Sequence, residues 1–278
     1  SHAEGNETIA SAESAHAEGT ATTASGNRSH AEGMDTLASG SQAHAEGNAT
    51  TASGDNSHAE GNATTASGIG SHAEGVTTDA SGEYSHAEGN GTTSSGNGSH
   101  SEGIDTVASG NGAHAEGDGA EATGDGAHAE GYQTTASGIY SHAQGSSTLA
   151  SGENSHAQGS RSVAAGLNST AIGTRAQTGA NAGVTIITDS QDVESTAEVA
   201  DSMKMRFQNG WDLVKGDGDD NSDGVNFRIR QASGNTTDGA AATIQTIAIP
   251  ADSTVMIKSK IVGVRTGGTA GNIADSAA

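Results

Sequence analysis

The sequence has 278 residues, with 42 glycines, one proline, no cysteine and only 2% aromatic residues. This composition cannot supply a core of large apolar side chains, so a compact enzyme of this size is not expected, and the absence of cysteine excludes disulfides and thiol catalysis. The net charge is −23, and residues 1 to 160 contain 21 acidic groups and a single basic group, Arg28, which excludes nucleic acid as a partner because phosphates would be repelled.

The hydropathy and the two ends of the sequence lead to expectations about membrane insertion and about the length of the whole protein. No run of about 18 apolar residues occurs, so no membrane insertion is expected in this segment. The sequence begins on the first residue of a repeat and ends in small polar residues. We therefore expect it to be a piece of a longer protein.

The first two thirds of the chain are an internal repeat. Twelve fourteen-residue units run in register from Ser1 to Asn168, and a degenerate thirteenth unit, STAIGTRAQTGANA, follows. All 12 histidines lie at unit position 2, position 4 is Glu in ten units and Gln in two, and position 5 is always Gly. Positions 3 and 10 are Ala with one exception each, and position 8 is Thr in most units. Such fidelity predicts one structural unit stacked on itself.

A unit of this length predicts one turn of a β-solenoid, with two short strands and two tight turns. The period of two within a strand places Ala3 on one face and His2 with Glu4 on the other. In the second strand, positions 8 and 10 share a face, so Ala and Thr fill the coil. An interior of such small residues buries little apolar surface. We therefore expect backbone ladders and a partner surface to supply the remaining stability.

The repeat resembles the head domain of the YadA-type trimeric adhesins, whose units read NSVAIG followed by AxAxG and have the same length. Residues 168 to 173 read NSTAIG, and residues 1 to 182 match the length, glycine spacing and alanine positions, with His in place of Val and Glu in place of Ile. The resemblance implies an all-β fold: a left-handed parallel β-roll over residues 1–182, assembled as a homotrimer. SHAEG variants also resemble repeats of phage tail fibres, so the resemblance does not choose between these fibres.

The resemblance further implies that positions 2 and 4 face the threefold axis of the trimer. The resulting trimer-axis ladder consists of His2, Glu4, His16, Glu18, His30, Glu32, His44, Glu46, His58, Glu60, His72, Glu74, His86, Glu88, His100, Glu102, His114, Glu116, His128, Glu130, His142, Gln144, His156 and Gln158. Imidazoles that donate to carboxylates of neighbouring chains are the favoured interpretation. Solvent exposure on a monomer and metal binding by stacked rings of three His stay open as alternatives.

Charge within the ladder leads to a pH expectation. Three buried carboxylates per layer would favour the charged imidazole, so we expect the His pKa to be raised and stability to be greatest at roughly pH 5 to 6.5. Catalysis is not expected, because a site that repeats ten times has no nucleophile or cleft particular to one unit. The Thr column resembles ice-binding arrays, but alternation places it inside the coil.

A different pattern begins at about residue 183 and predicts a small β-rich domain over 183–278, which we expect to be incomplete. Strands are expected at 184–188, 225–230, 243–249 and 254–264, between turns rich in Gly, Asn and Asp. Residues 192–207 are compatible with a short helix or with strands. The closing stretch, TIAIPADSTVMIKSKIVGVRTGG, resembles C-terminal knob domains that follow such repeats in phage tail proteins.

One loop of this domain contains residues of the kind that bind calcium. Asp219, Asn221 and Asp223 have the spacing of the first half of a calcium loop, which makes Ca²⁺ the one cofactor considered. Arg230 stands where a bidentate Glu is expected, so a solvated acidic turn is the favoured alternative. No other cofactor is expected.

These features predict a structural and adhesive segment of a trimeric extracellular fibre, without enzymatic activity. The adhesin neck motif, DAVNVxQL, is missing after the repeats, which favours a phage tail fibre or similar appendage. Attachment to a cell-surface receptor, glycan or matrix component is assigned to the C-terminal domain. The alternative is the head of a bacterial trimeric autotransporter adhesin, and alternatives of another class are an ice-binding solenoid and a tailspike enzyme.

Overall fold

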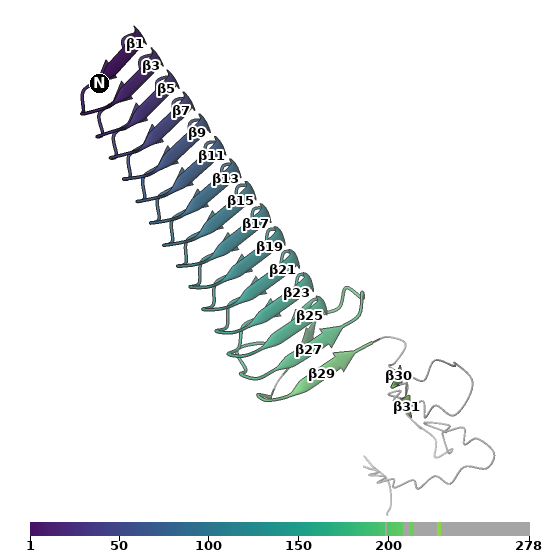
Figure 1. Ribbon diagram of the computed structural model, residues 1–278. Coiled ribbons are helices and arrows are strands. Elements are labelled where there is room, and N and C mark those ends of the chain that lie inside the picture. The colour runs from purple at the N-terminus through teal and green to yellow at the C-terminus, as the bar shows by residue number, and fades with distance from the viewer. Residues whose placement is uncertain (198, 208–211, 214–226, 229–278) are drawn as a thin grey trace, which may run out of the picture. The chain divides into compact units, whose positions relative to one another are not determined.

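The chain forms an all-β parallel solenoid (Figure 1). The computed structural model describes residues 1–197, 199–207, 212–213 and 227–228, all of which belong to the unit Ser1–Arg228. No helix occurs among these residues. The β-solenoid predicted from the 14-residue repeat is confirmed, and its strands are parallel, as the family resemblance implied.

Each turn contributes one longer strand to one sheet and one two-residue strand to a second sheet. The first sheet has 15 strands in this order: β1 (His2–Asn6), β3 (His16–Thr20), β5 (His30–Met34), β7 (His44–Asn48), β9 (His58–Asn62), β11 (His72–Val76), β13 (His86–Asn90), β15 (His100–Ile104), β17 (His114–Asp118), β19 (His128–Tyr132), β21 (His142–Ser146), β23 (His156–Ser160), β25 (Thr170–Thr174), β27 (Thr185–Thr188) and β29 (Met203–Arg206).

The second sheet has 14 strands, which alternate in sequence with those of the first. They are β2 (Ile9–Ala10), β4 (Thr23–Ala24), β6 (Leu37–Ala38), β8 (Thr51–Ala52), β10 (Thr65–Ala66), β12 (Asp79–Ala80), β14 (Thr93–Ser94), β16 (Val107–Ala108), β18 (Glu121–Ala122), β20 (Thr135–Ala136), β22 (Leu149–Ala150), β24 (Val163–Ala164), β26 (Ala176–Gln177) and β28 (Ser195–Thr196). Separately, β30 (Asp212–Leu213) pairs antiparallel with β31 (Phe227–Arg228).

The register of the repeat region is one full unit throughout, so that each residue pairs with its equivalent in the next unit. In the pair β11 and β13, for example, His72 lies opposite His86, Ala73 opposite Ala87 and Glu74 opposite Glu88. Every unit position therefore becomes a column that runs along the solenoid. Each column therefore consists of the residues at one position of the repeat.

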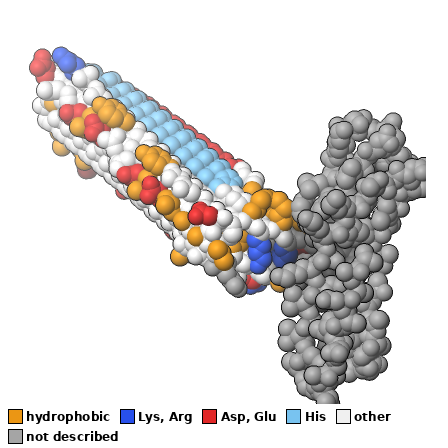
Figure 2. All heavy atoms as spheres, turned by 90° about the horizontal axis from the view of Figure 1, so that it is seen from below, with side chains coloured by type: hydrophobic (Ala, Val, Ile, Leu, Met, Phe, Trp, Pro, Cys, Tyr) orange, Lys and Arg blue, Asp and Glu red, His pale blue; other side chains and the backbone are white. Residues whose placement is uncertain are grey.

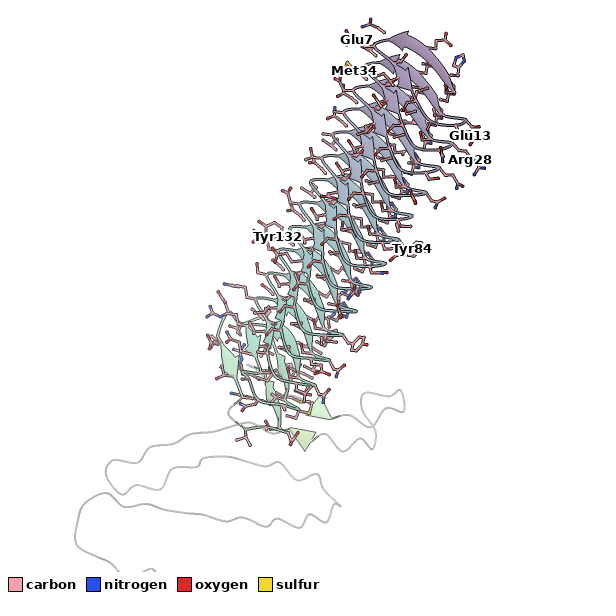
Figure 3. All side chains as sticks on the ribbon, turned by 90° about the vertical axis from the view of Figure 1, so that its left-hand side faces the viewer. Glu7, Glu13, Arg28, Met34, Tyr84 and Tyr132 are labelled. Atoms are coloured by element: carbon pink, nitrogen blue, oxygen red, sulfur yellow. The ribbon has the colours of Figure 1, made fainter. Side chains whose placement is uncertain are left out.

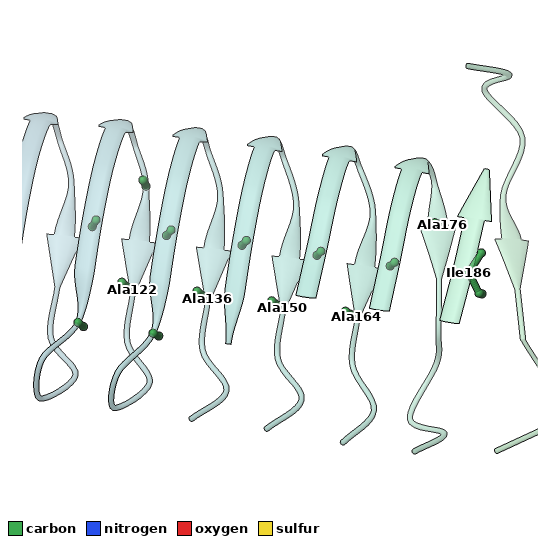
Figure 4. Packing of buried hydrophobic residues seen from close by; sticks show 14 of the residues in the cluster. Ala122, Ala136, Ala150, Ala164, Ala176 and Ile186 are labelled. Atoms are coloured by element: carbon green, nitrogen blue, oxygen red, sulfur yellow. The ribbon is translucent and has the colours of Figure 1, made fainter. Parts of the chain in front are cut away.

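The core consists of small residues from five unit positions: 1, 3, 8, 10 and 12. Ala73, Thr78 and Ala80 are at most 2% exposed, as predicted for positions 3, 8 and 10, and Figure 4 shows the alanine column from Ala122 to Ala164. Position 1 was not predicted to be buried. In five units, as at Ser71, a Ser hydroxyl at this position donates to the carbonyl of the glycine three residues earlier, at 2.6–2.8 Å.

The parallel stack extends beyond residue 182, where we expected the roll to end. β27 pairs with β25, and Ile186 lies opposite Ala171, in the buried alanine column of unit position 3. Figure 4 shows Ile186 in this part of the core. Residues 192–207, which the sequence left open between helix and strand, form β28 and β29, and β29 pairs with β27. Val184 and Ile186 are fully buried, so larger apolar residues fill this end of the core.

Two kinds of backbone position make the tight coil feasible. Gly75 at unit position 5 has φ +110°, and a Cβ there would collide with the carbonyl oxygen of Gly89 in the next turn. Unit positions 7 and 14 lie in the left-handed region, as at Thr77 and Tyr84. The corresponding turns form two opposite edges: Figure 3 shows Arg28 and Tyr84 on one and Tyr132 on the other.

We expect Gly75→Ala to be far more destabilising than Gly98→Ala. Both glycines have positive φ, but a Cβ on Gly98 has no atom within 4 Å, so Gly98→Ala incurs only backbone strain of about 1 kcal/mol. Gly75→Ala adds a backbone collision, and we expect a total of about 3 kcal/mol or more. Denaturant unfolding followed by circular dichroism measures both; equal midpoints for the two variants would contradict the close-approach explanation.

Candidate functional site

The histidines form a single stacked column on the outer face of the first sheet. Neighbouring imidazole centroids from His16 to His142 are 4.8–4.9 Å apart, with interplanar angles of 2–7°. At the two ends the arrangement changes, because His2 with His16 and His142 with His156 stand edge to face at 89° and 90°. Figure 2 shows the column as a continuous stripe along the solenoid.

The glutamates form a second column beside the first, as the period of two predicted. Nine Glu carboxylates lie 3.5–4.0 Å from Nε2 of the histidine two residues earlier. Of these pairs, His2 with Glu4 makes a hydrogen bond, at 3.5 Å. In the interior turns, such as His72 with Glu74, both side chains are between a third and two fifths exposed. The two columns are called the His–Glu ladder below.

Most imidazoles of the His–Glu ladder have a buried ring nitrogen that makes no hydrogen bond. Within the described chain, Nε2 is buried and makes no hydrogen bond in nine residues: His30, His44, His58, His72, His86, His100, His114, His128 and His142. A buried polar atom without a partner is unfavourable. The ladder therefore has unused hydrogen-bonding and ligand capacity along most of its length.

The pKa of five ladder histidines lies below the ordinary value of 6.5. Burial is the largest cause, the neighbouring imidazoles lower the pKa further, and the nearby Glu carboxylates act in the opposite direction. These residues are His30, His72, His100, His128 and His142. We expected a raised His pKa for three carboxylates per layer on a trimer axis, and that expectation stays a prediction. In the single chain the shift is in the opposite direction, because each ring is partly buried and lies between other imidazoles.

The composition of the outer face changes toward the C-terminal end. The Gln144 amide donates to Glu130 at 2.9 Å, and the Gln158 amide donates to Gln144 at 2.8 Å, so amides continue the carboxylate column. The same column then passes to Ile172, Ile187 and Met205. Sequence analysis missed the last two residues. The signal available was the β-branched run TIIT and the run MKMR, in which apolar and basic residues alternate.

Several groups of the His–Glu ladder have the composition of a metal site. In each, two histidines of successive turns and the glutamate between them place one ligand atom each within 4.8 Å of the others. They include His44–Glu46–His58, His72–Glu74–His86, His86–Glu88–His100, His100–Glu102–His114 and His114–Glu116–His128. Imidazole and carboxylate together suit borderline divalent ions such as Zn²⁺.

The other predicted sites have different outcomes. Asp219, Asn221 and Asp223 of the calcium loop lie outside the described residues, and the loop stays a prediction. From Thr22 onward the threonines of unit position 8 are buried, as Thr22 and Thr64 are, so this column offers no exposed lattice for ice.

Basic residues are concentrated where the repeat ends. Arg161 lies 2.9 Å from Asp192, and Arg175 contacts Asp192 at 3.4 Å and Glu194 at 3.6 Å. These pairs join the last repeat units to the segment between β27 and β28. They are exposed or half-exposed, so they orient this segment more than they stabilise it.

Fold and ladder together define a class: a parallel β-solenoid repeat protein whose long outer face carries one repeated pair of side chains. The family model of the YadA head domain repeat matches residues 17–43, 31–57, 101–127 and 150–176. The chain thus carries YadA head domain repeats, which are repeats of the adhesin type, and the resemblance noted for this region is confirmed. Comparison with curated proteins gives no match.

The described residues contain no helix with the length and apolar character needed to cross a bilayer. Proteins with YadA-like head repeats are fibres exposed at the surface. The homotrimer and the position of the ladder on its axis remain predictions.

We expect the protein to lose stability as the pH falls from 8 to 5.5. A His pKa that is lower in the folded chain means that the unfolded chain binds protons more readily. The contribution of these histidines is therefore full above about pH 6.5 and is lost as the pH falls through that value. Thermal unfolding with a chelator present measures the effect.

Replacement of His72 and His100 by Gln should make this pH dependence shallower. Replacement of the exposed Tyr84 by Gln, as a control, should leave the slope unchanged. A melting temperature that rises toward pH 5.5 would show that the carboxylates control the imidazole charge in the assembled protein.

Proposed function

We propose that the solenoid is the rigid head or stalk of a homotrimeric extracellular fibre of the adhesin type, with three chains packed through the His–Glu ladder face. The observation that carries the proposal is the continuation of this face into Ile172, Ile187, Met203 and Met205. Met203 is 60% exposed and Met205 is 40% exposed in the single chain. Exposed apolar residues that extend an ordered polar column are typical of a surface that is covered in the assembly.

Two further features support an assembly through this face. The core of one chain consists mainly of Ala, Ser and Thr, which bury little apolar surface per residue. Nine imidazoles of the ladder have a buried Nε2 that makes no hydrogen bond in the single chain, so this face is incompletely satisfied on its own. The presence of YadA head domain repeats agrees with this arrangement, since the resemblance implies a trimer with positions 2 and 4 on its axis.

Between the two kinds of fibre considered, the family match favours the head of a surface adhesin over a phage tail fibre. The solenoid then holds the adhesive part at a distance from the surface that carries it. At about 4.8 Å per turn, the 14 intervals between the 15 strands of the first sheet span roughly 70 Å. Enzymatic activity forms no part of this proposal.

Native mass spectrometry tests the assembly. We expect a trimer for the unaltered chain, and a monomer or weakened trimer for the double variant Ile187→Lys, Met205→Lys, because six positive charges would be buried together at one end of the interface. Tyr84→Lys is the matched control: Tyr84 is also exposed and apolar but lies on a turn edge. A stable folded monomer of the unaltered chain would refute the proposal.

Deletion of the residues after Arg206 tests the assignment of adhesion. The cut lies after β29 because the stack extends to this strand. Each turn depends on its neighbours, so the shortened chain should stay folded and trimeric while losing attachment to the target cells, glycans or matrix. If the shortened chain attaches as well as the full chain, binding belongs to the solenoid itself.

A further inference from the structure

We propose that the His–Glu ladder binds several divalent transition-metal ions per chain, each held by two imidazoles of successive turns and the carboxylate between them. The ions that suit this ligand set are Zn²⁺, Ni²⁺ and Cu²⁺. All three ligands come from one chain, so the inference does not rest on the proposed trimer or on its adhesive role.

The distance between imidazole and carboxylate is the first argument. In His44–Glu46, His58–Glu60 and His72–Glu74, Nε2 lies 3.6 Å from the carboxylate oxygen. This separation is too long for a direct hydrogen bond. Two ligands on a tetrahedral zinc ion, with bonds of about 2.0–2.1 Å, are about 3.3 Å apart. A shift of a few tenths of an ångström therefore brings both atoms into the coordination sphere of one ion.

The second imidazole requires a larger but local movement. Stacked rings 4.8 Å apart are too distant to share an ion, since two nitrogens on one ion are also about 3.3 Å apart. One ring must therefore turn toward its neighbour. At the two ends of the column, where His2 and His156 have an imidazole on one side only, the terminal ring stands at 89° or 90° to its neighbour; an interior ring would have to turn in the same way when it binds the ion.

Burial and charge favour the ligand form of these side chains. A metal ion binds imidazole through an unprotonated ring nitrogen, and in each group Nε2 lies beside the carboxylate that would complete the ligand set. Nε2 of His72 and of His100 has no hydrogen-bond partner in the described chain that a metal would have to displace. The excess of acidic groups in residues 1 to 160 raises the local concentration of cations.

Shared ligands limit the number of ions. His86 belongs to two of the groups, one with Glu74 and one with Glu88, and its Nε2 can bind one ion. Occupied sites must therefore alternate along the ladder. Three of the groups have no residue in common: His44–Glu46–His58, His72–Glu74–His86 and His100–Glu102–His114. We expect at least three ions per chain.

Two histidine variants of equal composition test the spacing. The alternate variant replaces His2, His30, His58, His86, His114 and His142 by Gln, which leaves six histidines that are each two turns apart. The block variant replaces His2, His16, His30, His44, His58 and His72 by Gln, which leaves six histidines in successive turns. Equilibrium dialysis of untagged full-length protein with Zn²⁺ or Ni²⁺ at pH 7.5 counts the ions bound.

We expect the alternate variant to lose at least tenfold in affinity, and the block variant to keep about half of the ions at unchanged affinity. Equal binding by the two variants would overturn the proposal, because it would mean that binding depends only on the number of histidines. Failure of the unaltered protein to bind either ion at millimolar concentration would overturn it as well. Circular dichroism verifies that both variants are folded.

A third variant tests the carboxylate. Replacement of all ten position-4 glutamates by Gln should keep the column intact, since Gln144 and Gln158 already continue it through amide hydrogen bonds, and should weaken binding at least tenfold. Unchanged affinity would exclude the carboxylate as a ligand. Co²⁺ absorption and X-ray absorption of the unaltered protein provide a readout that needs no variant: a site without two imidazoles would overturn the proposal.

Discussion

Backbone pairing between each residue and its equivalent in the next repeat unit is the interaction on which the rest of this structure depends. A core of Ala, Ser and Thr buries little apolar surface, so the backbone hydrogen bonds between turns carry a large share of the stability. It also requires adjacent turns to approach at the spacing of one β-ladder. Gly19 and Gly75 follow from this requirement, because any side chain at unit position 5 would meet the carbonyl of the next turn.

In-register pairing has an electrostatic consequence, because it places identical ionisable groups next to one another. Each ladder histidine lies about 4.8 Å from its neighbours, and each glutamate lies opposite other glutamates. Burial is the main reason why the pKa of His72 and His100 lies below its ordinary value, and repulsion between neighbouring imidazolium charges at this distance lowers it further. Neutral imidazole is then the form in which stacking has the lowest electrostatic cost.

The sequence was sufficient to predict the solenoid, because the 14-residue period and the alternation within each strand are both visible in it. The inward direction of Ala73 and Thr78 and the outward direction of His72 and Glu74 follow from those two periods alone. Burial of Ser71 was not foreseen, although Ser71 lies two residues before Ala73 and the same alternation places it on the inward face. A strand at 184–188 was expected and is present as Thr185–Thr188. The continuation of the solenoid through this strand and through Met203–Arg206 was missed, since the 14-residue period is absent there although the pairing continues.

The direction of the His pKa could not be obtained from the sequence, because it depends on a balance between burial, imidazoles and carboxylates. In the sequence, His and Glu two residues apart suggest an attractive pair, which would raise the His pKa. The structure places other imidazoles among the nearest ionisable groups of each ring, with centroids 4.8 Å apart. It also buries Nε2. Geometry therefore decides the sign where composition alone favours the opposite one.

The constant register of one unit also makes the length of the molecule adjustable. Removal or duplication of one whole unit leaves every column continuous, whereas insertion of a single residue within a strand would turn His and Glu inward and Ala outward. Each added unit lengthens the stack by about 4.8 Å without altering its cross-section. The length of the solenoid can therefore change in steps of one repeat unit, through recombination between units, while the fold stays the same.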